Sequence, residues 1–227
     1  MNKHFRIAAL AAALATAQGA AQATLITTAP GGASVIDFDD AASYVTGGPS
    51  VQTGGAIGAD VQVSTLGGPL QFGAPYGAWT LSDNGEWTGA SFVGVDGAFQ
   101  DEANGIAASL VFDLAIPQGS VGGFLNFDPS FVYGGGLPLP LYIAAYDGSG
   151  TLLEDHFVPL WTPGGLNAGS FFGISLDSNA IARFEVSGPY AVLDNLTLAP
   201  VPEPGSVALL MAGLGVLGAV ARRRREN

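Results

Sequence analysis

Glycine and proline divide most of this chain into short apolar segments, and this punctuation limits the possible folds more than any other feature. The 227 residues include 34 glycines and 14 prolines, which separate apolar runs of about five to nine residues. Runs of this length between turn-forming residues are typical of β-strands. No stretch between residues 24 and 200 shows the 3.6-residue period of an amphipathic helix. We therefore predict an all-β domain.

Several of these segments alternate apolar and polar residues, which places one side of a strand against a core. Ala108, Leu110, Phe112 and Leu114 share one face of a predicted strand, and residues 147–150 (Asp-Gly-Ser-Gly) form a turn signal between two others. The predicted strands cover residues 34–39, 60–65, 78–82, 90–95, 106–114, 121–127, 139–146, 152–158, 170–176, 181–187 and 190–198. About ten strands with turns every 8–12 residues predict a two-sheet antiparallel sandwich, jelly-roll-like in type.

The N-terminal residues have the composition of a signal peptide. Lys3 and Arg6 precede an apolar, alanine-rich segment at 7–17, and Ala21-Gln22-Ala23 is an A-x-A cleavage site. An uncleaved anchor is the alternative, but the apolar segment is short for a membrane span. We therefore divide the chain into a signal peptide at 1–23, a β-sandwich domain at 24–198, and a linker with a C-terminal signal at 199–227.

The C-terminal residues contain three parts that together make a sorting signal. Two prolines in Pro202-Glu203-Pro204 favour an extended, exposed backbone. The apolar run from Ser206 to Ala221 makes a transmembrane helix of roughly 24 Å, just under the hydrocarbon thickness of a bilayer. Four arginines then act as a stop-transfer signal that keeps the end cytoplasmic. They are Arg222, Arg223, Arg224 and Arg225.

This arrangement resembles the PEP-CTERM sorting signal of Gram-negative bacteria. The resemblance implies that an exosortase, a membrane-embedded cysteine transpeptidase, recognises the Pro-Glu-Pro tripeptide. It also implies an exported precursor anchored in the inner membrane by its C-terminal helix, which later reaches the cell surface or the exopolysaccharide matrix. An ordinary C-terminal membrane anchor with a chance Pro-Glu-Pro is the alternative. The resemblance covers about the last 27 residues, so it leaves the activity of the domain open.

The charge of the exported domain excludes some partners. Of seven Lys and Arg residues, two lie in the signal peptide and four at the C-terminus, so only Arg183 remains between residues 24 and 200. Seventeen of the nineteen acidic residues lie there, which gives a net charge near −16. We expect no nucleic-acid partner, because phosphate binding needs cationic side chains. Calcium or a neutral polysaccharide suits this charge better.

We do not expect an enzyme. Cysteine is absent, which removes thiol catalysis and thiolate metal sites. His156 is the only histidine of the domain, and a lone strand histidine is usually a surface residue of its sheet. Paired carboxylates of a glycosidase or lyase remain a third and weaker alternative, since acidic residues are plentiful.

The composition favours calcium as a cofactor, bound as a structural ion. Asp37, Asp39 and Asp40 lie near the start of the domain, and Asp194-Asn195 lies in its last strand. First and last strands are commonly neighbours in a jelly roll, so Asp37, Asp39, Asp194 and Asn195 could share one ion. An ion pair between Arg183 and Asp194 is the competing interpretation. A second acidic loop at 96–105 has ligand-type residues, but we interpret it as a turn.

Aromatic residues give the other candidate site. Trp87 follows Asp83-Asn84-Gly85-Glu86, which indicates a turn, so it is a candidate for an exposed ring that stacks on sugar rings, and a core position is the competing interpretation. Trp79 and Trp161 have the same potential, although tryptophans in a sandwich are more often part of the core.

The domain is also similar, more weakly, to exported jelly-roll surface proteins and carbohydrate-binding modules. The similarity lies in residues 35–40 (Val-Ile-Asp-Phe-Asp-Asp) and in the closing segments around 172–174, 181–184 and 192–196. We therefore expect a structural or adhesive role in extracellular polysaccharide. A specific carbohydrate-binding module is the alternative.

Overall fold

The computed structural model describes residues 23–38, 50–52, 55–58, 60–73, 81, 84, 92–127, 139–162 and 168–201. Within these residues the regular secondary structure is β-strand and no α-helix is present, so the all-β prediction is confirmed. No helix in the described ranges has the length and hydrophobicity that a membrane span needs. The expected signal peptide up to residue 22 and the expected transmembrane helix lie outside the described residues.

The larger sheet contains eight antiparallel strands. Seven follow the order β1-β14-β11-β16-β7-β6-β3. The eighth, β2, pairs with β16 on the same edge as β7, further along the strand. Their bounds are β1 (Thr24–Ile26), β2 (Ser34–Ile36), β3 (Ser50–Gln52), β6 (Leu70–Gly73), β7 (Phe92–Val95), β11 (Ser120–Asn126), β14 (Ser170–Ser175) and β16 (Val192–Ala199). The last strand of the domain therefore lies in the interior of this sheet.

The second sheet contains six antiparallel strands in the order β13-β12-β15-β10-β5-β4. Their bounds are β4 (Gly55–Gly58), β5 (Val61–Leu66), β10 (Ser109–Gln118), β12 (Leu141–Tyr146), β13 (Leu152–Val158) and β15 (Ile181–Ser187). A separate two-stranded hairpin is formed by β8 (Phe99–Asp101) and β9 (Ile106–Ala107).

The chain alternates between the two sheets. It passes from β10 in the smaller sheet to β11 in the larger, back to β12 and β13, and then through β14, β15 and β16 in turn. This crossing pattern resembles a jelly roll, although both sheets are larger than the four strands of a simple eight-stranded one. The predicted antiparallel sandwich is confirmed.

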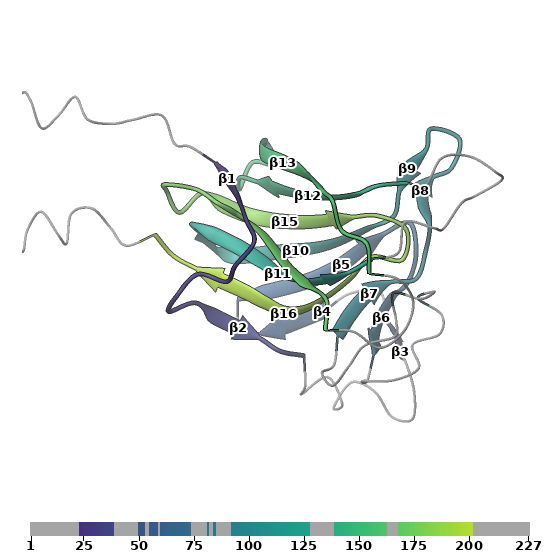
Figure 1. Cartoon of the computed structure of the whole chain (residues 1–227), viewed down its shortest axis with the longest axis horizontal. Coiled ribbons are helices and arrows are strands. Elements are labelled where there is room, and N and C mark those ends of the chain that lie inside the picture. Colours follow the sequence, from purple (N-terminus) through teal and green to yellow (C-terminus); the bar gives the residue numbers. More distant parts are fainter. Residues whose placement is uncertain are drawn as a thin grey trace, which may run out of the picture.

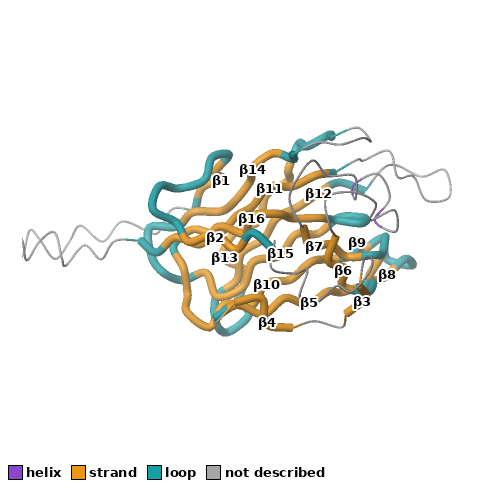
Figure 2. Tube along the Cα trace, turned by 90° about the horizontal axis from the view of Figure 1, so that it is seen from below, coloured by secondary structure: helices purple, strands orange, loops and turns teal. Residues whose placement is uncertain are grey.

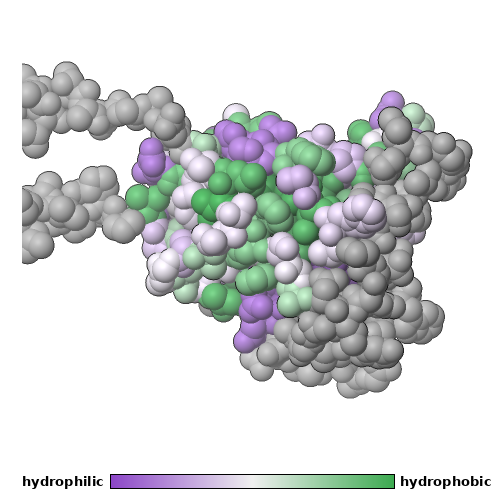
Figure 3. All heavy atoms as spheres, in the orientation of Figure 1, coloured by the Kyte–Doolittle hydropathy of each residue, from purple (hydrophilic) through white to green (hydrophobic). Residues whose placement is uncertain are grey.

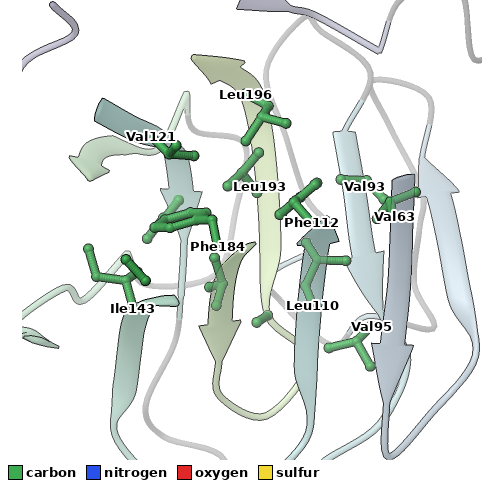
Figure 4. Close-up of a cluster of buried hydrophobic side chains, with 14 of the residues drawn as sticks. Val63, Val93, Val95, Leu110, Phe112, Val121, Ile143, Phe184, Leu193 and Leu196 are labelled. Atoms are coloured by element: carbon green, nitrogen blue, oxygen red, sulfur yellow. The ribbon is translucent and has the colours of Figure 1, made fainter. Parts of the chain in front are cut away.

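The two sheets enclose one main hydrophobic core (Figure 4). Leu110, Phe112 and Phe184 of the smaller sheet and Val93 and Leu193 of the larger sheet are fully buried. They point into the space between the sheets, as the alternation in β10 and β15 predicts. A domain without disulfides depends on this core for its stability.

Both ends of the domain lie at the same end of the sandwich. Thr24 pairs with Ser175, Ser175 with Ser120, and Ser120 with Ala199, so these four residues form one row across four strands. We call this the terminal end; the left of Figure 1 shows β1 and the end of β16 there. The opposite end, near Asn126, is the distal end, and Figure 2 shows the strands running between the two with loops at both.

Candidate functional site

Val201, the last described residue of the chain, is held against the domain by Asn179. The Val201 N–H donates to Asn179 Oδ1 at 2.6 Å, and Asn179 Nδ2 donates to the Val201 carbonyl at 3.3 Å. Asn179 lies in the turn between β14 and β15, at the terminal end. Both backbone polar groups of Val201 are therefore bound by one side chain, and we call this pair of hydrogen bonds the Asn179 clamp.

Gly119 forms the surface on which Val201 rests. It lies in the turn between β10 and β11, where its N–H donates to the Ala199 carbonyl at 3.0 Å and its own carbonyl accepts from the Leu176 N–H at 2.7 Å. A Cβ on this glycine would collide with the Val201 side chain and approach the Val201 nitrogen to 2.8 Å. The close approach of Val201 therefore requires glycine at position 119.

The residues that follow carry the sorting function. The family model of the PEP-CTERM protein-sorting motif matches residues 200–225. The chain carries a PEP-CTERM sorting motif. It is thus the exported, membrane-anchored precursor of an exosortase substrate, with the predicted Pro202-Glu203-Pro204 and Arg222–Arg225 inside the matched range. A search of curated proteins and a search of solved structures found no match.

The PEP-CTERM match indicates that the protein is exported and sorted. It does not indicate what the β-sandwich domain binds or does. The tripeptide and the arginine cluster lie outside the described residues. Of the matched range the structure describes only Pro200 and Val201, which follow β16 and contact the domain at Asn179 and Gly119.

Two of the predicted calcium ligands, Asp37 and Asn195, lie beside the pairing of β2 with the last strand, β16. The antiparallel pairing of β2 with β16 brings Ile36 opposite Leu196, so Asp37 continues toward Asn195. The strand predicted at 34–39 is therefore a neighbour of the last strand, whereas the first strand of the structure, β1, pairs with β14. Asp39 lies outside the described residues, and among those described no three Asp, Glu or His side chains cluster as a metal site would require. The calcium site remains a prediction.

Asp194 and Asn195 form a local structure of their own. Asp194 is buried, and its carboxylate accepts hydrogen bonds from the Asn195 N–H at 2.6 Å and from Asn195 Nδ2 at 2.8 Å. Asn195 has a φ of 52°, and the register with β11 shifts between Gly122 and Phe124. These features define a β-bulge, in which asparagine tolerates the left-handed conformation.

The second acidic loop is a turn, as interpreted from the sequence. The Asp101 carboxylate accepts hydrogen bonds from Asn104 Nδ2 at 2.6 Å and from the Asn104 N–H at 3.2 Å, and these bonds lower its pKa. Asp96 instead accepts from Gln71 Nε2 at 2.8 Å, and burial raises its pKa. The two acids therefore have separate structural partners.

Arg183 pairs with Asp113 and not with Asp194. Arg183 Nε donates to Asp113 Oδ1 at 2.6 Å across the β10–β15 ladder, and this bond raises the pKa of the arginine. Asp194 belongs to the other sheet, so the competing ion pair considered from the sequence is wrong. The Arg183–Asp113 pair and the turn at 147–150 line a groove of about 420 Å³ at the terminal end.

Among the described residues, Trp161 is exposed to solvent. Its side chain is 68% exposed, whereas Trp87 lies outside the described residues. Both neighbours of Trp161 are anchored. Leu160 packs against the core, and Thr162 exchanges hydrogen bonds with Phe127 at 2.6 and 2.7 Å. The exposed ring is therefore carried by a fixed backbone at the distal end.

Two more aromatic side chains are exposed on the outer face of the smaller sheet. Tyr142 and Phe157 lie opposite each other in β12 and β13, with ring centroids 5.9 Å apart, and are 40% and 53% exposed. The next row of this face pairs Asp155 with Ala144 and Ala144 with Glu185. Figure 3 shows hydrophilic residues gathered along the upper edge of the visible face, over β13.

His156 lies on β13, as predicted. Its Nε2 is 3.3 Å from Glu154 Oε1 and makes no hydrogen bond in the described structure, and its side chain is 24% exposed.

Proposed function

We propose that the domain is a structural and adhesive component of the extracellular polysaccharide matrix, and that it holds polysaccharide through aromatic side chains at its distal end. The observation that supports this proposal is the exposure of Trp161 between two anchored neighbours, at the end opposite the sorting junction. Because the residues on both sides of Trp161 are held in place, little backbone freedom is lost when a sugar ring stacks on its side chain.

The acidic side chains on the outer face of the smaller sheet, one row from Tyr142 and Phe157, favour a neutral polysaccharide. Asp155 and Glu185 offer carboxylate oxygens that accept hydrogen bonds from sugar hydroxyl groups. The domain has a net charge near −16, which repels acidic polysaccharides unless a divalent cation bridges them. Sorting carries the domain out of the cell, and attachment at the terminal end leaves the distal aromatic residues facing away from the membrane.

The test is co-sedimentation of the mature, surface-released protein with the exopolysaccharide of the producing cell. Trp161→Ala should weaken binding by roughly tenfold, which is about 1.4 kcal/mol, while Trp161→Phe keeps most of it. Ile116→Ala is a matched control, because Ile116 is exposed to 57% in the part of β10 near the terminal end. Equal binding by the parent and by Trp161→Ala would reject this site.

A specific carbohydrate-binding module is the second candidate. The groove lined by Asp113, Arg183 and the 147–150 turn favours it, because a groove of about 420 Å³ with charged side chains suits one oligosaccharide better than a polymer surface. Calorimetry with defined neutral oligosaccharides distinguishes the two. Saturable one-to-one binding that Arg183→Gln abolishes supports the module, and Trp87→Ala tests the tryptophan predicted from sequence. Turnover of the polysaccharide would instead indicate a glycosidase or lyase.

A further inference from the structure

The sorting tripeptide follows the folded domain with no free residue between them. Ala199 is paired with Ser120 in the sheet, Val201 is bound by Asn179, and Pro202 is the next residue. The residues immediately before the tripeptide are therefore part of the fold.

The clamp also limits how far the domain can lie from the membrane. Pro202, Glu203, Pro204 and Gly205 separate Val201 from Ser206, where the apolar run begins. Five residue steps span at most roughly 18 Å when fully extended. The polar layer of a bilayer outside its hydrocarbon core is about 5–7 Å thick on each side. A membrane-embedded exosortase must therefore reach the tripeptide within a narrow space below the terminal end.

Proteins that recognise an extended peptide commonly bind it through its backbone N–H and C=O groups. In this protein both groups of Val201 are already bonded to the Asn179 side chain. We propose that Asn179 is a positioning residue for sorting. Its two hydrogen bonds hold Val201, the residue before the tripeptide, on the domain. Exosortase engages the tripeptide only after Val201 has detached from Asn179.

Detachment does not require unfolding. The two hydrogen bonds of the clamp are at the surface, so they open locally while the sheet stays intact. The clamp acts on the docking step that precedes cleavage and leaves the chemistry of the exosortase unchanged.

The experiment measures how fast the full-length precursor loses its C-terminal tail in membranes that contain the exosortase. Pulse-chase labelling gives the initial rate. Asn179→Ala removes both hydrogen bonds, and Gly119→Ala displaces Val201 by its added Cβ. Each should raise the rate by roughly three- to tenfold, the effect expected when one or two exposed hydrogen bonds are lost. Asn104→Ala, in the distal β8–β9 turn, is the matched control and should leave the rate unchanged.

A precursor with a longer linker distinguishes the effect of losing the clamp from the effect of a general destabilisation of the domain. Insertion of Gly-Ser-Gly-Ser between Val201 and Pro202 supplies free residues while Asn179 stays bound to Val201. This precursor should be processed faster than the parent, and adding Asn179→Ala to it should have no further effect.

Three results would overturn the proposal. They are an unchanged or slower rate for Asn179→Ala, an equal acceleration by Asn179→Ala with and without the inserted linker, and no processing of any precursor. No polysaccharide is present in this assay, so its outcome is independent of the proposed matrix role.

Discussion

Asp147 organises the turn between β12 and β13 with one carboxylate oxygen. Its Oδ1 accepts hydrogen bonds from the N–H groups of Ser149 and Thr151 at 2.8 and 2.9 Å and from Ser149 Oγ at 2.6 Å. Gly150 supplies the positive φ of 83° that closes the turn. The Ser149 side-chain bond, followed by the backbone bond from Thr151, lowers the pKa of Asp147.

These bonds predict a pH dependence. A carboxylate whose pKa is lower in the folded state stabilises the fold above its unfolded pKa, and this contribution disappears as pH falls through the folded value. Asp147→Asn keeps the shape but loses the charge, so its Tm should be about 2 °C lower than the parent at pH 7. The difference in Tm between the parent and Asp147→Asn should shrink below about pH 4, which is the ordinary pKa of an aspartate. Thermal scans from pH 7 to pH 3 measure it, and a constant difference would contradict this role.

Single residues also show where prediction from the sequence ends. The turn at 147–150 was predictable because aspartate and glycine act through neighbours in the chain. The partner of Arg183 was not, because only the pairing of β15 with β10 brings Asp113 beside it. No pattern marks Asn179 as the residue that binds Val201, and no pattern separates the exposed Trp161 from a core tryptophan.

At the scale of elements, β10 and β15 form the centre of the smaller sheet. Phe112 and Phe184 lie opposite each other in these strands, with ring centroids 6.4 Å apart, and both are fully buried. Phe112→Ala should lower the free energy of unfolding by about 3–5 kcal/mol, because it removes a buried ring and leaves a cavity. Urea unfolding checks this value. Ile116→Ala on the same strand should change it by less than about 0.5 kcal/mol.

The pairing of β2 with β16 is where the calcium prediction applies. An ion near Asp37, Asp39 and Asp194 that binds only the native state would add about 2.7 kcal/mol at a hundredfold excess over Kd. The Tm should then rise by roughly 5–10 °C. Asp194→Asn should remove this rise. Sodium chloride at matched ionic strength controls for screening of the acidic surface, and an equal rise with either salt would exclude a specific site.

Prediction of the elements succeeded where local signals were strong. The bounds predicted for β13 and β15 are those observed, because alternation within each strand ends at clear turn residues. Strand β10 continues beyond the predicted end at Leu114 to Gln118, past Pro117, where its register with β15 shifts. The short strands β1, β3, β4, β6 and β8 were not predicted, because three or four residues carry too little periodicity.

At the scale of the whole molecule, the sandwich has two ends with different properties. The terminal end carries Thr24, the Asn179 clamp and the sorting motif that follows, and the distal end carries Trp161. The all-β class was predictable from glycine and proline spacing. The placement of Thr24 in the same row of the sheet as Ala199 was not, because it depends on pairing between strands about 150 residues apart in sequence, β1 with β14.

The interior position of β16 predicts the effect of truncation. This strand pairs with β11 on one edge and with β2 and β7 on the other. A chain that ends at Ser187 lacks it and should be digested rapidly by added protease, whereas a chain that ends at Val201 should resist. Limited proteolysis of the two chains distinguishes them, and equal resistance would show that the sheet closes without its last strand.

The position of β16 also sets the order of events during export. Contacts between distant parts of a chain form late, and here β1 and β2, the first strands to cross the membrane, pair with β14 and β16, among the last. Ala199 precedes the apolar run at Ser206 by only seven positions, so we expect that run to enter the bilayer as the final strand becomes free to pair. On this order of events the domain completes its folding while its C-terminal end is held at the membrane.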